Sequence, residues 1–131
     1  MKIRYTDQGT AEVTMRDYLM EAIDESGLDI QQIAATPARR TLFEVNAEAP
    51  ALPKERSDSF WSVVMKLLYV AMRARMDLLL AISFLSTRIS KSTTEDKDKL
   101  KRVLEYIKGT AYMKYTLGAD NLGRFRSWVD A

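Results

Sequence analysis

The stretch from Phe60 to Gly109 constrains the fold more than any other part of this sequence. Apolar residues recur in it with helical spacing in three segments, which predicts two antiparallel apolar helices followed by an amphipathic helix. The first segment begins at a cap on Ser57 and is apolar nearly all round, so we expect it to be buried on most sides. Asp77 is placed to cap the second segment, and Gly109 is placed to end the third.

The third segment combines an apolar face with a basic one. Overlapping capping boxes lie in residues 92–96, and apolar residues then follow at i, i+3, i+4 and i+7. The other face carries Lys97, Lys99, Lys101, Arg102 and Lys108. Residues 66–108 hold ten Lys or Arg against five Asp or Glu, whereas residues 1–65 hold seven against eleven. This local positive field suits a polyanion such as nucleic acid, and a solvated lysine-rich helix face is the alternative.

The regions on either side of this stretch predict a sheet and a long loop. Apolar and polar residues alternate in residues 2–14, which predicts a β-hairpin with its turn at Gly9. Thr14 is placed to cap a following helix, and Gly27 is placed to end it. Residues 28–56 lack a period and contain three prolines, so we expect a loop with a short turn near 30–34 and a mobile linker at 47–56. Tyr112–Leu117 and Phe125–Val129 predict a C-terminal strand pair. The expected class is α+β and mainly helical, with about four helices.

Composition excludes several kinds of function. The chain has no cysteine and no histidine, so it holds no thiolate metal site and no histidine-dependent catalytic triad. No apolar run reaches the roughly 20 residues that span a bilayer, and the N-terminal residues lack a signal-peptide core. We therefore expect an intracellular chain, cytoplasmic or nuclear, with no membrane partner.

Two groups of side chains each leave two interpretations open. Arg73 and Arg75 lie in the short break between the apolar helices, where they could face phosphates or could bond the carbonyls at helix C-termini. Five aromatic residues could stack on bases or belong to the core, which helical spacing among Leu and Val favours. They are Trp61, Tyr69, Phe84, Tyr106 and Tyr112. The acidic pairs Asp24-Glu25 and Glu95-Asp96 are better explained by capping and solvation than by acid–base chemistry.

The sequence motifs of the central stretch resemble those of a known family. LLYVA at 67–71, RMD at 75–77, AISFLS at 81–86 and LKRVLEYIKGT at 100–110 are similar, in order and spacing, to the Pol polyprotein of copia-type LTR retrotransposons. In that family the series follows the reverse-transcriptase palm. Met1 to Met15 resembles the primer-grip hairpin, DYL at 17–19 and TP at 36–37 resemble the thumb, and WVDA at 128–131 resembles the first strand of RNase H.

The resemblance implies a segment of a reverse transcriptase/RNase H rather than a complete enzyme. Residues 1–27 would end the palm and begin the thumb, 28–56 would be a linker, 57–110 a helical thumb/connection subdomain, and 111–131 a truncated start of RNase H. The polymerase aspartates would lie before Met1, and Asp130 would be the first RNase H metal ligand, so the chain alone would be inactive. Mg²⁺ is implied for the full-length enzyme. The implied partners are an RNA/DNA primer–template duplex and the remainder of Pol.

The residues expected to contact that duplex are Arg73, Arg75, Lys97, Lys101, Arg102 and Lys108. Two positions depart from the family pattern: Met76 stands where proline usually precedes Asp77, and Lys97 stands where tryptophan is usual. The alternative function is a free-standing helical protein-interaction module, dimeric through the helix at 60–72. A complete nuclease or polymerase is disfavoured because its carboxylates are missing.

Overall fold

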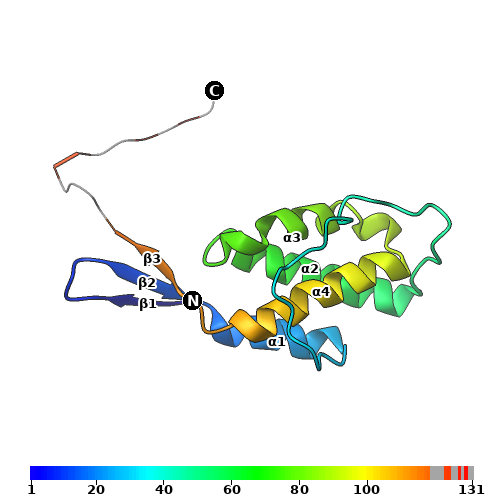
Figure 1. Cartoon of the computed structure of the whole chain (residues 1–131), viewed down its shortest axis with the longest axis horizontal. Helices are drawn as coiled ribbons and strands as arrows, with labels where there is room; N and C mark the ends of the chain where they lie inside the picture. The colour runs from blue at the N-terminus through cyan, green and yellow to red at the C-terminus, as the bar shows by residue number, and fades with distance from the viewer. Residues whose placement is uncertain (119–122, 125–126, 128, 130–131) are drawn as a thin grey trace.

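The computed structural model describes residues 1–118, 123–124, 127 and 129. Over that part the chain is α+β and mainly helical, as the sequence predicts, with a three-stranded antiparallel sheet and four α-helices. Figure 1 shows the sheet projecting from one end of a body made by the helices. Since only the base of the sheet reaches this body, the hydrophobic core lies mostly among the helices.

The sheet is built on the predicted hairpin. Strands β1 (Lys2–Tyr5) and β2 (Ala11–Thr14) pair antiparallel, and Gly9 takes a φ of 77° in the turn between them. Strand β3 (Tyr115–Leu117) pairs with the other edge of β2, so the order is β1-β2-β3. The first predicted C-terminal strand therefore joins the hairpin. The second, Phe125–Val129, lies largely outside the described residues.

Helix α1 (Arg16–Ser26) carries the predicted apolar stripe and ends as predicted. Leu19, Ala22 and Ile23 are buried, and Gly27 closes the helix in the left-handed conformation with a φ of 63°. The prediction that Thr14 caps this helix was wrong. Thr14 ends β2 and the capping position falls on Met15, whose buried side chain forms no cap hydrogen bond.

Helix α2 (Lys54–Ala71) begins three residues before the predicted cap. Proline at the N-cap position 53 precedes the first free N–H groups, where its missing donor costs nothing. The predicted cap, Ser57, instead places its hydroxyl 3.0 Å from that of Ser92. The prediction of a mobile linker at 47–56 was also wrong, because Ala51 forms a β-bridge with Thr93 and the last three residues belong to the first turn of α2.

One side of α2 remains exposed, contrary to the expectation of burial on most sides. The helix packs against α1 and against α3 (Leu79–Ser86), and its inner residues are almost fully buried. The exposed side carries Trp61, Met65, Tyr69 and Met72, whose exposed fractions are 53%, 40%, 44% and 61%. Helical spacing predicts that these residues belong to an apolar helix, but it does not show which faces of the helix another element covers.

Between α2 and α3 lies the 3₁₀ turn η1 (Met76–Leu78), and Asp77 sits inside this turn. The prediction that Asp77 caps the second apolar helix was wrong, since α3 makes no side-chain cap bond at its N-cap. A second 3₁₀ turn, η2 (Ile89–Lys91), leads from α3 to α4 (Thr94–Thr110). Helix α4 contacts both α1 and α3 and closes the helical body.

Helix α4 is the element that the sequence predicts best. Thr93 and Asp96 form the reciprocal capping box, and the four predicted apolar residues, Leu100, Val103, Leu104 and Ile107, are buried. Its predicted stop was wrong: Gly109 lies inside the helix, which runs on to Thr110.

Candidate nucleic-acid interface

The long loop between α1 and α2 lies against α4, the helix expected to bind nucleic acid (Figure 1). Residues 28–53 contain no helix, yet Ile30, Ala34 and Leu42 are buried. The predicted turn near 30–34 is absent, and the turns lie at 40–43 and 47–48. Because Ala34 N–H donates to the Glu105 carbonyl at 3.3 Å, the loop is fixed along the helix by backbone as well as by side chains.

Three cations of α4 bind this loop through its carbonyl oxygens. Lys99 Nζ donates to Glu44, Arg102 Nε donates to Thr36 at 3.1 Å, and Lys108 Nζ donates to Ile30. Backbone carbonyls in a loop lack the hydrogen-bond partners that a helix or sheet provides, and the charged side chains of lysine and arginine can donate to them instead. Two of the residues predicted to contact nucleic acid, Arg102 and Lys108, therefore already hold the loop to the helix.

Gly109 is explained by the same loop, because a Cβ there would lie 2.3 Å from Ile33 Cγ2. Gly109→Ala should lower the free energy of unfolding by about 1 kcal/mol, since the clash outweighs the gain in helix propensity. In an Ile33→Ala background the same change should instead raise stability by about 1 kcal/mol. Urea unfolding of the four variants measures both values, and the same sign in both backgrounds would contradict the contact.

Arg75 is buried and is engaged by the protein. Its side chain is 3% exposed, its guanidinium binds both carboxylate oxygens of Asp77 at 3.0 and 2.8 Å, and it also donates to the carbonyl and hydroxyl of Thr110. The expectation that Arg75 faces phosphates does not fit this placement. The burial follows from the position of the α2–η1 turn, which lies against the C-terminal end of α4.

Arg73 is exposed, and it stays close to its own helix. Its guanidinium lies 3.7 Å from the centre of the Tyr69 ring and donates to the Tyr69 carbonyl at 3.2 Å. Both arginines of the break thus bond carbonyls in the last turns of helices, α2 for Arg73 and α4 for Arg75. Of the two interpretations that the sequence leaves open, the structure favours the second.

The ion pair of Arg75 also shapes two pKa values. Burial alone would raise the pKa of Asp77, but hydrogen bonds from Arg75 and Tyr106, together with the charge of Arg75, lower it overall. Burial and the hydrogen bond that its hydroxyl donates to Asp77, at 2.8 Å, raise the pKa of Tyr106. These shifts describe a stable structural cluster that joins η1 to α4.

Little of the positive charge of residues 66–108 is left free. Three of the ten cations pair with carboxylates, three bind loop carbonyls, and Arg73 stacks on Tyr69. The remaining three, Lys91, Lys97 and Lys101, have no side-chain partner among the described residues. The charge excess seen in the sequence therefore overstates the surface available to a polyanion.

Four cations nevertheless form a row across the face of α4. Lys97 and Lys101 lie one helical turn apart, and each lines a pocket. Arg39 of the loop joins Lys101 in a pocket of about 450 Å³, and Arg56 of α2 joins Lys97 in a pocket of about 230 Å³. We call Arg39, Lys101, Lys97 and Arg56 the basic row. None of the four has a hydrogen-bond or ion-pair partner for its side chain in the described part of the chain.

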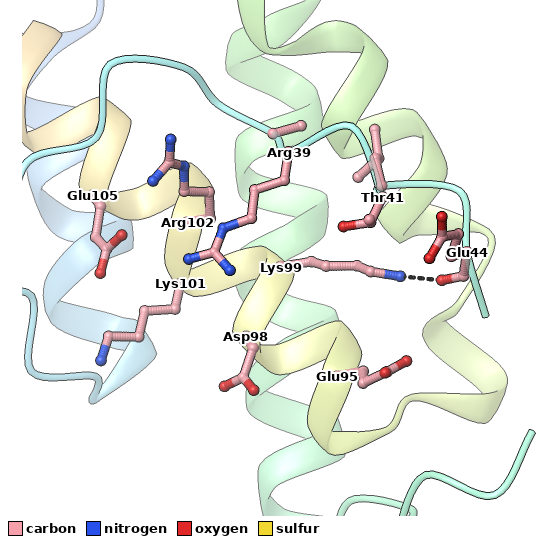
Figure 2. Close-up of a pocket in the computed structure, with 11 residues that line it drawn as sticks. Arg39, Thr41, Glu44, Glu95, Asp98, Lys99, Lys101, Arg102 and Glu105 are labelled. Atoms are coloured by element: carbon pink, nitrogen blue, oxygen red, sulfur yellow. Dashed lines mark hydrogen bonds between the residues drawn. The ribbon is translucent and has the colours of Figure 1, made fainter. Parts of the chain in front are cut away.

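The field of the basic row differs between its two ends. The larger pocket also carries four carboxylates, which match the charge of its four cations, Arg39, Lys99, Lys101 and Arg102 (Figure 2). They belong to Glu44, Glu95, Asp98 and Glu105. The smaller pocket has only Arg56 and Lys97 as charged lining residues. Lys97 thus lies where the positive field is least opposed.

Sequence reasoning missed Arg39 and Arg56. Both precede the basic stretch, in the region with more acidic than basic residues. Their position beside α4 depends on the path of the loop and on the packing of α2, which no local pattern reveals.

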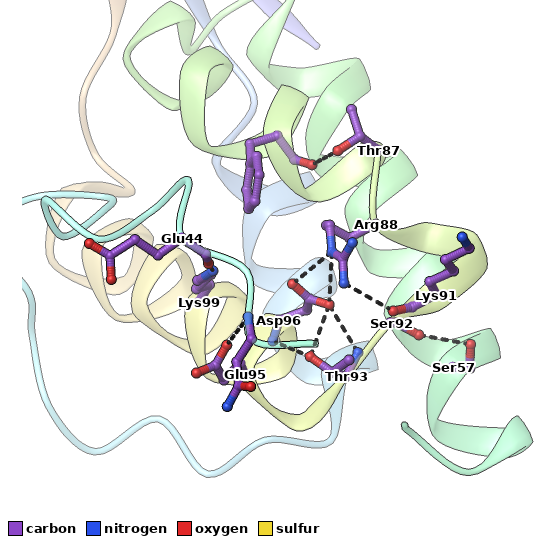
Figure 3. Close-up of polar contacts among 12 residues, drawn as sticks. Glu44, Ser57, Thr87, Arg88, Lys91, Ser92, Thr93, Glu95, Asp96 and Lys99 are labelled. Carbon is purple, nitrogen blue, oxygen red and sulfur yellow. Dashed lines mark hydrogen bonds and ion pairs between the residues drawn. The ribbon is translucent and has the colours of Figure 1, made fainter. Parts of the chain in front are cut away.

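A polar cluster organises the N-terminal end of α4 (Figure 3). Asp96 is 2% exposed, accepts from the backbone N–H of Thr93 at 2.9 Å, and pairs with Arg88 at 3.3 Å. Glu25 of the other acidic pair binds Lys66 at 2.8 Å. Capping accounts for Asp96 as predicted, whereas Glu25 is held by an ion pair that was not predicted from the sequence.

The structure tests the core interpretation of the five aromatic residues and does not describe the candidate metal ligand. In the described part of the chain, no group of three His, Cys, Asp or Glu residues could hold a metal ion, and Asp130 lies outside that part. The core interpretation was wrong for Trp61, Tyr69 and Tyr112, which are 53%, 44% and 73% exposed. It holds in part for Phe84 and Tyr106, which pack against the core.

A helix long and apolar enough to cross a membrane is not found among the described residues. Comparisons with protein-family models, with curated proteins and with solved structures return no match for this chain.

Proposed function

We propose that the chain is a non-catalytic segment of a copia-type Pol polyprotein, running from the reverse-transcriptase thumb and connection towards RNase H. Its part would be to contact the phosphate backbone of an RNA/DNA primer–template duplex. The sequence motifs of residues 67–110 support the assignment to this polyprotein. The basic row carries the contact, because it gathers four cations without side-chain partners from the loop, α2 and α4.

The chemistry of the basic row fits a backbone contact. Lysine and arginine bind phosphate oxygens without reading base edges, so binding should be independent of sequence. Few cations take part and carboxylates flank one end of the row, so binding should be weak and strongly reduced by salt. Lys108 adds to this face, since its ammonium retains donors beyond the one that binds Ile30.

In this proposal the catalytic groups lie elsewhere in the polyprotein. Mg²⁺ would serve the full-length enzyme, and Asp130 would be the first of its RNase H ligands. The chain would act inside the cell, joined to the rest of Pol, and would show no metal-dependent turnover when purified alone.

The double variant Lys97→Gln/Lys101→Gln should weaken binding to a fluorescent RNA–DNA hybrid about tenfold, because it removes the centre of the basic row. Fluorescence anisotropy measures the dissociation constant. The matched control, Arg16→Gln/Lys91→Gln, removes two exposed cations from the start of α1 and from η2, outside both pockets, and should change it by less than about twofold. Equal losses in the two double variants, or a preference for one base sequence, would contradict the proposal.

A further inference from the structure

The exposed side of α2 is a continuous apolar stripe. Trp61, Met65, Tyr69 and Met72 recur at i, i+4, i+8 and i+11, which places them on one face of the helix. We call these four residues the α2 stripe. Helices α1 and α3 pack on the other sides of α2, and nothing in the described part of the chain covers this face.

The composition of the α2 stripe suits a protein interface. Tryptophan and tyrosine are the residue types that most often dominate binding energy, and methionine adapts to an opposing surface. The ring of Tyr69 is already held in place, by Tyr18 at 5.6 Å between centroids and by the Arg73 guanidinium at 3.7 Å. A pre-ordered aromatic side chain loses little conformational freedom on binding.

We propose that a second copy of this chain covers the α2 stripe, with the two α2 helices antiparallel about a two-fold axis at Met65. In this register Met65 meets itself, and Trp61 of each copy meets Tyr69 of the other, since each lies four residues from Met65. The surface is thus complementary to itself, as a two-fold dimer requires.

Charges beside the stripe select this orientation. Asp58 and Arg73 lie seven and eight residues on either side of Met65, and both are exposed. Asp58 lies about 20° around the helix from Met65, and Arg73, just past the end of α2, is held beside the stripe by its stacking on Tyr69. An antiparallel pair therefore places Asp58 of each copy beside Arg73 of the other, twice. A parallel pair would place like charges together, which is unfavourable.

This dimer is independent of the proposed duplex contact. By the same helical geometry Arg56 faces away from the α2 stripe, roughly on the opposite side of α2 from Trp61 and Met65. The basic row and the stripe can therefore be occupied together, and loss of one should leave the other intact.

Sedimentation velocity over a concentration series of the whole chain tests the dimer. The wild type should sediment as a monomer–dimer equilibrium. Met65→Lys should make it monomeric, because it places two ammonium groups on the two-fold axis, while the exposed position accepts lysine without loss of the fold. Tyr5→Ser, which removes an apolar side chain that is 82% exposed on the sheet, should leave the dimer unchanged.

Charge exchange tests the register. Asp58→Arg and Arg73→Glu should each weaken the dimer at least tenfold through like-charge contacts, and the double variant should restore it. Thermal melting by circular dichroism shows that each variant is folded. A wild type that stays monomeric, a dimer that survives Met65→Lys, or a double variant no better than the single ones would each overturn the proposal.

Discussion

Replacing Arg75 with alanine should lower the free energy of unfolding by about 3 kcal/mol, the largest effect of any change to a charged residue considered for this chain. Arg75 is 3% exposed and joins the α2–η1 turn to the end of α4 through Asp77 and Thr110. Its removal leaves the Asp77 carboxylate, which is one-third exposed, without its cation and leaves the Thr110 carbonyl without its donor. Urea unfolding followed by circular dichroism measures the loss.

Two further arginine variants and a pH series sharpen this prediction. Arg73→Ala is the matched control and should cost less than about 1 kcal/mol, because Arg73 is exposed and its stacking and hydrogen bond are both made to Tyr69 of its own helix. The loss of unfolding free energy in Arg75→Lys should lie between those of Arg75→Ala and Arg73→Ala, since lysine keeps the charge and loses the two-point contact with Asp77. Equal effects of Arg73→Ala and Arg75→Ala would contradict the structure.

The lowered pKa of Asp77 sets the direction of the pH effect. A carboxyl group whose pKa is lower in the folded state stabilises the fold above its unfolded pKa, which is about 4, and loses that contribution as pH falls through the folded value. The wild type should therefore lose more stability between neutral and acid pH than Asp77→Asn does. A parallel decline in the two proteins would show that Asp77 carries no such linkage.

Asp96→Ala should cost about 2 kcal/mol, the second largest effect. The carboxylate is 2% exposed, and its loss removes the capping box with Thr93 and leaves Arg88 without its partner. Asp98→Ala is the matched control, since Asp98 lies exposed on the same helix and should change stability by less than about 0.5 kcal/mol. A cost for Asp96→Ala no larger than that of Asp98→Ala would show that the cap contributes nothing.

What could be predicted from the sequence was encoded over short distances. The capping box of α4, its apolar face, and the turns at Gly9 and Gly27 each depend on residues within a few positions of one another. The path of residues 28–53 could not be predicted, because it depends on contacts with α4 between residues that lie 44 to 78 positions apart in the chain. Gly109 lies inside α4 although glycine commonly ends a helix, and the loop residue Ile33 packs against it.

The candidate site shows the same division. The spacing of basic residues predicted a basic face on α4, but it could not predict which groups of the protein those side chains bind. Arg75, Arg102 and Lys108 proved to bind the protein itself, and Arg39 and Arg56 reached the site from regions without a positive signal. From the sequence, α2 was expected to be buried on most sides and a dimer through residues 60–72 was only an alternative, since periodicity shows an apolar face without showing what covers it.

These placements change which residues test the nucleic-acid proposal. Loss of binding in an Arg75 variant would report a weakened fold, because Arg75 is buried. Lys97 and Lys101 are better probes, since they bind nothing else in the described part of the chain.

The salt dependence of binding to an RNA–DNA hybrid is the most direct test of the proposal that this chain contacts a duplex through its phosphates. Four cations in the basic row predict that the logarithm of the binding constant falls with the logarithm of salt concentration with a slope of about −3.6. The slope should be the same for hybrids of different sequence. Absent binding, or binding that salt leaves unchanged, would contradict the account.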